Sequence, residues 1–531
     1  MGAQRGVAVA RLSARLIRRG ALAIMIGMGA YMAFEAFAFK TSYPDAQSRA
    51  ALTIWGRDPV IRIIAGPAHA VDTVGGFVVW DAGLYVTLIL GAWAITTTTR
   101  LLRGDEDAGR VELVLAGPIR PARALLSQLA VLAGACAGVG LAIALALALS
   151  GAQAWGAVLL GAAIAGYCAT FVGVSAVASQ VFATRGAALG GAASVLAASV
   201  LLRMVSNSAD SRAWLGWLTP VGWTDHLRAF GDNRWPVVLV PLVVAAALAV
   251  VAAVLRHRRD AGAGLLAGKE AHRSHAWALG SPLAFAWRSS LGALLAWTAG
   301  VAVTGLVLGG MVPTLEEFLV SDTGFQDILA ALGMDVSDLA RGYIGMTSII
   351  VGLVIAVYSA FRMGTARGEE ASTRAEFLLT RPVRRWRWLG GHVLCLVASV
   401  LLLCAATSGA MWLGGAIAGA DLAASDAFAA MLNTVPAVLV FAGVSVLVLG
   451  VAPRLPVAVG ATAPVVAYVV EVVGPLLDWP KWLVGISPFH HLEAVPVDPV
   501  GLPAAIVMVA VAVVLMVAGI VAFERRDLVG A

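Results

Sequence analysis

The chain has 531 residues, 60% of them hydrophobic and only 13% charged, and its mean hydropathy is +0.87. These values exclude an ordinary soluble domain, in which roughly a quarter of the residues are charged. A bilayer core about 30 Å thick is crossed by a helix of roughly 20 apolar residues, and the chain supplies about twelve such stretches. We therefore expect a polytopic membrane protein.

The apolar stretches are long and are separated by short polar segments. Strands of a membrane barrel would be about 10 residues of alternating polarity, so the pattern predicts an all-α bundle. In chain order the predicted spans are residues 20–39, 78–99, 125–150, 156–182, 186–206, 236–255, 291–311, 343–361, 389–417, 430–452, 456–477 and 502–523. The first stretch is about 20 residues long and offers no small-residue cleavage site, so no cleavable signal peptide is expected.

The distribution of positive charge predicts the orientation of the chain. If the N-terminus lies in the cytoplasm, 27 of the 37 Lys and Arg residues fall on the cytoplasmic side. Because cytoplasmic loops of membrane proteins carry an excess of Lys and Arg, both termini are predicted to be cytoplasmic and the protein to lie in the inner (plasma) membrane. The net charge of +6 then reflects topology, and no nucleic-acid partner is expected.

Two charged segments repeat at an offset of 264 residues. RGDEDAGRVELVLAGPIRPAR, starting at Arg103, aligns without gaps with RGEEASTRAEFLLTRPVRRWR, starting at Arg367, and nine of the 21 positions are identical. The sequence RRD also recurs, at 258–260 and 525–527. We therefore predict two homologous six-helix halves, residues 1–265 and 266–531, which insert in the same orientation around a pseudo-two-fold axis along the membrane normal.

In each repeated segment a glutamate precedes an arginine by four residues: Glu106 precedes Arg110, and Glu370 precedes Arg374. This order favours an ion pair on a short helix. Apolar residues follow, so each helix is expected to have one apolar face that lies at the membrane surface or docks in a groove of another protein. Two copies of one docking helix imply two copies of one partner surface.

The two half-repeats, the duplicated loop after the second span and the RRD sequences after the sixth resemble ABC type-2 exporter permeases. More narrowly, they resemble actinobacterial exporter permeases for tetronasin and other polyketide antibiotics. The resemblance implies coupling helices near 103–118 and 367–382, amphipathic connecting helices at Arg5–Arg19 and Trp277–Ser289, and re-entrant helices within 207–235 and 478–501. The residues that it assigns to ATPase coupling are Glu106, Arg110, Glu112, Glu370, Arg374 and Glu376.

The chain itself is not expected to be an enzyme. Its nearest approach to a phosphate-binding loop, AGLLAGKE at 263–270, lacks the first Gly and the Ser/Thr that would hold Mg²⁺. ATP and Mg²⁺ are therefore assigned to separate ABC ATPase subunits, in two copies. No metal site is expected. His490 and His491, with Glu493 nearby, are adjacent in the sequence and lack a further ligand at the spacing that metal sites show. The four cysteines fall in apolar spans and are predicted to be buried thiols.

Ionisable groups within spans are functional candidates, because exposing them to lipid is costly. The candidate substrate path consists of Tyr31, Glu35, Asp81 and Tyr85. These residues either bind a cationic drug or move protons, or they form an interfacial belt.

The expected function is multidrug or antibiotic efflux of a hydrophobic small molecule. Three alternatives remain open. A lipid or glycan exporter has a similar architecture, a proton-coupled secondary transporter needs charged groups near the midplane, and a membrane-embedded enzyme needs a polar catalytic cluster.

Overall fold

The computed structural model describes residues 2–56, 59–111, 119–259, 264–265, 280–313, 336–371, 380, 383–476 and 479–528. Within these residues every regular element is a helix, as the sequence predicted. The chain divides into two compact units, Met1–Arg273 and Ser274–Ala531. This division falls in a stretch outside the described residues, so the domain boundary predicted between 265 and 266 stays a prediction.

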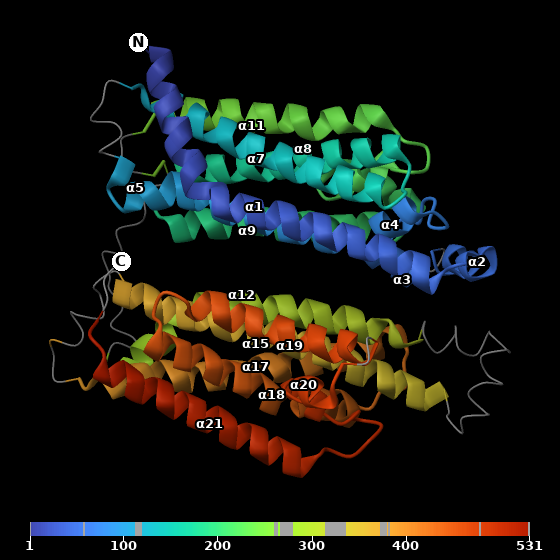
Figure 1. Ribbon diagram of the computed structural model, residues 1–531, viewed down its shortest axis with the longest axis vertical. Helices are drawn as coiled ribbons and strands as arrows, with labels where there is room; N and C mark the ends of the chain where they lie inside the picture. Colours follow the sequence, from blue (N-terminus) through green and yellow to red (C-terminus); the bar gives the residue numbers. More distant parts are fainter. Residues whose placement is uncertain are drawn as a thin grey trace. The chain divides into compact units, whose positions relative to one another are not determined.

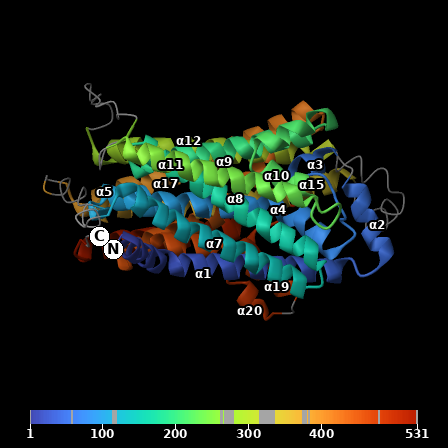
Figure 2. The ribbon, with the colours of Figure 1, turned by 90° about the horizontal axis from the view of Figure 1, so that it is seen from above.

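The first unit is a bundle of long helices that lie side by side (Figure 1). Its elements are α1 (Gly2–Ser42), α2 (Ala46–Trp55), α3 (Pro59–Ala65), α4 (Val74–Thr99), η1 (Arg100–Gly104), α5 (Asp105–Asp107), α7 (Pro121–Leu149), α8 (Ala154–Val181), α9 (Arg185–Asn207), η2 (Asp210–Leu218), α10 (Gly222–Leu227), η3 (Trp235–Val238) and α11 (Leu239–His257). The short helix α5 lies at one end of this bundle, and α2 and α3 lie at the other (Figures 1 and 2).

The second unit is a bundle of the same kind. Its described elements are α12 (Pro282–Gly310), α15 (Val336–Ala371), α17 (Arg385–Ala418), α18 (Ala424–Val451), α19 (Pro456–Leu476), α20 (Lys481–Val484), η4 (Pro488–His491) and α21 (Leu502–Arg525). Helices α7 and α17 begin at Pro121 and Arg385, which are separated by the same 264 residues as the repeated segments. The repeat in the sequence therefore corresponds to the same helix start in both units.

Eleven helices of the described residues are long and apolar enough to cross a bilayer. Each matches one of the twelve predicted spans. The remaining span, predicted at 456–477, coincides with α19. The apolar part of this helix, Pro456–Val472, is shorter than the other eleven spans. The protein is thus an all-helical, multi-pass membrane protein.

The segment before the first span differs from the expectation. The predicted connecting helix Arg5–Arg19 is not separate, because α1 runs without interruption from Gly2 to Ser42. The second predicted connecting helix, Trp277–Ser289, is described only from 280 onward, where residues from Pro282 belong to α12. In the two segments predicted to be re-entrant, the structure contains the short helices η2, α10, α20 and η4.

Small residues let the long helices approach closely. A Cβ atom on Gly140 of α7 would lie 2.2 Å from the carbonyl oxygen of Gly161 of α8. In the second unit a Cβ on Gly450 of α18 would lie 2.3 Å from the carbonyl oxygen of Gly519 of α21. Such contacts are typical of helices that associate in lipid, where van der Waals packing replaces the hydrophobic drive. Substituting these glycines would force the helix pairs apart.

Candidate functional site: a charge clamp in each half

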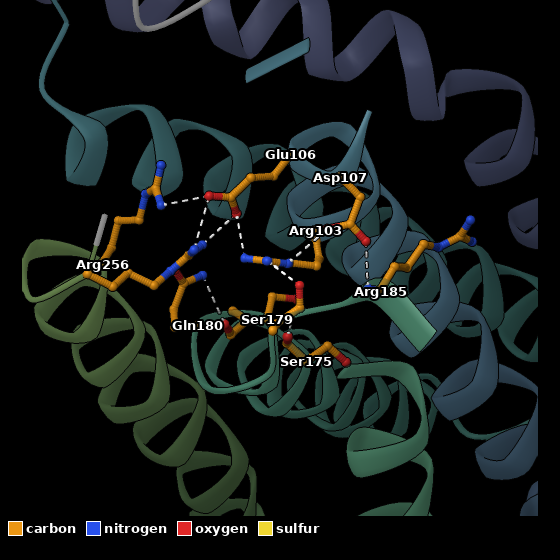
Figure 3. Close-up of polar contacts among 11 residues, drawn as sticks. Arg103, Glu106, Asp107, Ser175, Ser179, Gln180, Arg185 and Arg256 are labelled. Carbon is orange, nitrogen blue, oxygen red and sulfur yellow. Dashed lines mark hydrogen bonds and ion pairs between the residues drawn. The ribbon is translucent and has the colours of Figure 1, made fainter. Parts of the chain in front are cut away.

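A buried cluster of charge lies where α5 meets the end of α11. The carboxylate of Glu106 is within 3.1 Å of Arg103 Nη1, 3.1 Å of Arg256 Nη1 and 2.5 Å of Arg259 Nη2. Figure 3 shows Arg103 and Arg256 pointing toward Glu106. The side chains of Glu106 and of the three arginines are each no more than 8% exposed. We call these four residues the first clamp.

The first clamp joins four helices. Arg259, just beyond the end of α11, also donates from Nε to Gln180 Oε1 of α8 at 2.8 Å. Arg103 pairs with Asp107 at 3.1 Å and donates to the carbonyl of Ala183. Asp107 in turn accepts the backbone N–H of Arg185, the first residue of α9, at 2.8 Å. Because a buried charge is tolerated only when it is paired, these bonds fix α5 to the ends of α8, α9 and α11.

The local backbone explains how Glu106 comes to point inward. The helix of the second span does not end at Thr99 but continues as a π-helical turn, Arg100–Gly104, before α5. A π-helical turn shifts the register of the following side chains and often marks a functional segment. Gly109 then adopts a φ of +71°, a left-handed conformation that favours glycine. The equivalent position of the second half is Thr373, which lies outside the described residues.

The second unit contains the corresponding cluster. Glu370 pairs with Arg526 through two bonds, of 2.6 and 2.8 Å, and with Arg367 at 3.3 Å. The Glu370 side chain is 1% exposed, and Arg526 also donates to the carbonyl of Leu449 in α18. We call Glu370, Arg367 and Arg526 the second clamp. A two-bond Arg–carboxylate pair is both strong and geometrically specific.

The two clamps are built from equivalent residues. Glu106 and Glu370 are 264 residues apart, whereas Arg259 and Arg526 are the second arginines of the two RRD sequences. In both halves the bond therefore joins the segment after the second span to the end of the last span. The sequence shows both motifs but does not by itself show that they bind each other. The signal that could have paired them is that each half contains one copy of both.

The structure corrects the predicted ion pair between Glu106 and Arg110. Glu106 turns inward to the first clamp, while Arg110 pairs with Asp105 at 2.6 Å and keeps 61% of its side chain exposed. Glu370 turns inward in the same way. The other predicted coupling residues, Glu112, Arg374 and Glu376, lie outside the described residues, and the coupling role of all six stays a prediction.

The four residues of the candidate substrate path lie together. Glu35 of α1 interacts with Tyr31 on the same helix and with Asp81 of α4. Tyr85, one turn beyond Asp81, interacts with both carboxyl groups and is 55% exposed. Two carboxyl groups this close do not both ionise readily, because like charges repel. The arrangement suits either shared protonation or a cationic ligand.

At the opposite end of the first unit, sequence reasoning missed a buried ion pair. Arg203 of α9 bonds to both oxygens of Asp225 of α10, at 2.7 and 3.0 Å, and donates to the carbonyl of Ala65 at 2.9 Å. The signal was available, since Arg203 is an arginine inside a predicted apolar span. Equivalent in position to Arg203 is Glu471 of α19, which pairs with His490 at 3.2 Å.

A polar cavity of about 260 Å³ adjoins the Arg203–Asp225 pair. Among its lining residues are His69 and His226. Burial lowers the pKa of both imidazoles, and the positive charge of Arg228 lowers both further. His226 stacks on Trp217, with ring centroids 4.4 Å apart. Both histidines are therefore expected to be neutral at pH 7.

Other expectations concern metals and thiols. Among the described residues, no group of three or more His, Cys, Asp or Glu side chains is placed to hold a metal ion. His490 instead contacts Glu471, and His491 contacts the carbonyl of Gly485. The four cysteines, Cys136, Cys168, Cys395 and Cys404, are free and buried, as predicted.

Comparison with known proteins agrees with the duplicated architecture. The sequence model of a family described as "Multidrug efflux system permease Rv1217c, C-terminal domain" matches residues 9–256 and 279–524, one segment in each half. The multidrug efflux system permease protein Rv1217c of Mycobacterium tuberculosis (strain ATCC 25618 / H37Rv) is 31% identical over 492 residues, which cover 92% of this chain and 88% of that protein. The chain therefore belongs to the Rv1217c family of efflux permeases.

Proposed function

We propose that the chain is the permease subunit of an ATP-driven ABC type-2 exporter that removes hydrophobic drugs or antibiotics from the cell. Two separate ABC ATPase subunits would bind its cytoplasmic face and hold the ATP and Mg²⁺. The relative from Mycobacterium tuberculosis, whose name describes a multidrug efflux permease, supports the class of substrate. The two clamps support the mode of coupling.

The observation that carries the coupling proposal is the repeated bond from Glu106 to Arg259 and from Glu370 to Arg526. Each clamp ties the predicted coupling helix to the end of the last span in its half. A displacement of the coupling helix by an ATPase would then reach two spans of that half at once. Glu106 and Glu370 are too buried to form the contact surface, so we assign them to transmission and assign the contact to exposed residues such as Arg110.

Glu35 with Asp81 would attract substrates that carry a positive charge. A lipid or glycan exporter would share the coupling but would have no need of this carboxyl pair. A proton-coupled transporter is the second candidate, because the Glu35–Asp81 pair is suited to holding a proton.

Transport by inside-out vesicles tests the proposal. The vesicles come from cells that express the chain with a candidate ABC ATPase, and uptake of a cationic fluorescent dye is measured with ATP and with a protonophore. The proposal predicts uptake that needs ATP, stops with vanadate and persists when the protonophore collapses the proton gradient. Uptake that depends on the proton gradient and does not require ATP would contradict the proposal and favour a proton-coupled transporter.

Paired substitutions in the predicted coupling helices test the partner. The variant with Glu112→Lys and Glu376→Lys should lose copurification of the ATPase. Asp498→Lys is a matched control, because it reverses a charge on an exposed residue of the predicted outer side and should leave copurification intact. Retention of the ATPase by the double variant would show that these helices do not form the contact.

A further inference from the structure

A cavity of about 480 Å³ adjoins the first clamp. It lies among the first half of α1, the η1–α5 segment, the start of α7 and the end of α11, all in the first unit. By the predicted orientation this is the cytoplasmic end of the unit, at the level of the lipid headgroups. The clamp closes one side of the cavity, and no residue of the candidate substrate path lines it.

The charge that lines the cavity is unbalanced. Four arginines, Arg100, Arg110, Arg256 and Arg259, face two carboxylates, Asp105 and Glu106. The two carboxylates already bind Arg110, Arg256 and Arg259. Among the described residues Arg100 has no such ion pair, and it is exposed. Among the described lining residues, positive charges therefore exceed negative charges by two.

The start of α7 adds to this preference for an anion. Pro121, its first residue, lines the cavity, and no side chain caps the N-terminus of this 29-residue helix. The backbone N–H groups at a helix N-terminus and the helix dipole both favour negative charge. Two separate features, the excess of arginine and the uncapped helix, thus point to the same kind of ligand.

The opposite wall of the cavity is apolar. It is formed by Val9, Leu12 and Leu16 of α1, and the two leucines are 48% and 52% exposed. Nearby arginines on α1 leave these leucines as an apolar strip on an otherwise basic helix. An occupant that satisfies both walls has an anionic head and an apolar body. Basic sites at the cytoplasmic side of membrane proteins are suited to anionic lipid headgroups.

The described residues of the second half place larger side chains at the equivalent positions. Trp388 and His392, at the positions equivalent to Ala124 and Gln128 of the first half, are 1% and 0% exposed. Trp388 stacks on Phe523, and Phe523 stands where the first half has Arg256. In the second half a stacked aromatic pair therefore fills the volume that the first half leaves open between an alanine and an arginine.

We propose that this cavity of the first half binds the phosphate headgroup of an anionic phospholipid, with Arg100 as the principal uncompensated charge and the α1 leucines against the acyl chains. The site is specific to the first half, because Trp388 and His392 occupy its counterpart. This inference does not depend on the ATP-driven function proposed above.

Native mass spectrometry of the purified full chain tests the proposal, with phosphatidylglycerol and phosphatidylcholine of matched acyl chains as probes. We expect phosphatidylglycerol to bind at least tenfold more tightly than phosphatidylcholine. Arg100→Gln should weaken phosphatidylglycerol binding about tenfold. The double variant Ala124→Trp, Gln128→His, which gives the first half the side chains of the second, should abolish it.

Arg123→Gln is the matched control, because Arg123 is an exposed arginine of α7 that does not line the cavity, and it should bind phosphatidylglycerol as the wild type does. Cooperative thermal unfolding checks the fold of each variant, and Arg100→Gln decides the question if the double variant does not fold. Equal binding of the two lipids, or equal loss in Arg100→Gln and Arg123→Gln, would overturn the proposal. So would binding of inorganic phosphate as tight as that of the lipid, since the site would then take a free anion.

Discussion

The two clamps share two bonds and differ in much of what surrounds them. In both halves a buried glutamate after the second span binds the arginine three residues before it and an arginine at the end of the last span. In the first half a further arginine, Arg256, shares the carboxylate and a cavity lies alongside. In the second half Arg526 lies over the ring of Phe523, and aromatic side chains close the space. The two halves thus keep the same ion pairs, whereas the neighbouring side chains differ.

The opposite ends of the bundles show a similar divergence. The last turns of α9 and α19 each bind the short helices that follow. In the first half the bond is the buried pair of Arg203 with Asp225, whereas in the second it is the more exposed pair of Glu471 with His490. The two halves thus have the same connections but different charge and burial.

The largest expected effect sharpens the comparison of the clamps. Glu106→Gln removes the carboxylate that Arg103, Arg256 and Arg259 share, although Arg103 keeps its bond to Asp107, so it should lower the free energy of unfolding by about 3–5 kcal/mol. Glu370→Gln leaves two arginines and should cost less, about 2 kcal/mol. Denaturation of the purified variants in mixed micelles measures both. Equal losses would mean that the additional arginine of the first clamp, Arg256, adds nothing to stability.

The next effect compares the opposite ends of the halves. Arg203→Met breaks a buried, two-bond pair and should cost about 3 kcal/mol, because Asp225 stays behind as a buried charge. Glu471→Gln removes half of an exposed pair and should cost less than about 1 kcal/mol. The same unfolding measurement applies. A cost for Glu471→Gln that matches that of Arg203→Met would show that exposure does not set the strength of these bonds.

A smaller effect depends on pH and belongs to the first half. Burial lowers the pKa of His69 and His226 in the folded protein, so the unfolded chain binds more protons below its own histidine pKa of about 6.5. The stabilisation is complete above that pH and is lost as the pH falls toward the folded-state values. The variant His69→Asn, His226→Phe should flatten the decline in thermal stability between pH 7 and 5. If the decline in thermal stability is unchanged in this variant, titratable groups other than His69 and His226 cause it.

The smallest effect separates stability from contact. Arg110 pairs with Asp105 but is 61% exposed, so Arg110→Gln should change the free energy of unfolding by less than about 1 kcal/mol. If Arg110 belongs to the surface that the ATPase contacts, the variant should nevertheless copurify with less ATPase. If Arg110→Gln instead unfolds more easily and still copurifies with the ATPase, Arg110 stabilises the fold and does not contact the ATPase.

Hydropathy and the repeat were enough to predict the helical class and the position of the spans, and the repeat singled out Glu106 and Glu370, whose coupling role stays a prediction. The direction of Glu106 was not predictable from spacing, because the i,i+4 argument assumes a regular helix and the chain forms a π-helical turn before it. The partners Arg256 and Arg259 lie 150 and 153 residues away from Glu106 in sequence, so only the fold brings them together. Arg203 was detectable, since an isolated arginine in an apolar span needs a partner.

A charge exchange in the second clamp tests the central claim most directly, with ATP-driven dye uptake and ATPase copurification measured in the same vesicles. Glu370→Arg and Arg526→Glu should each reduce uptake about tenfold while the ATPase still copurifies. The combined variant restores an opposite-charge pair and should recover most of the uptake. Wild-type uptake in both single variants, or loss of uptake that the combined variant does not repair, would contradict transmission through the clamp.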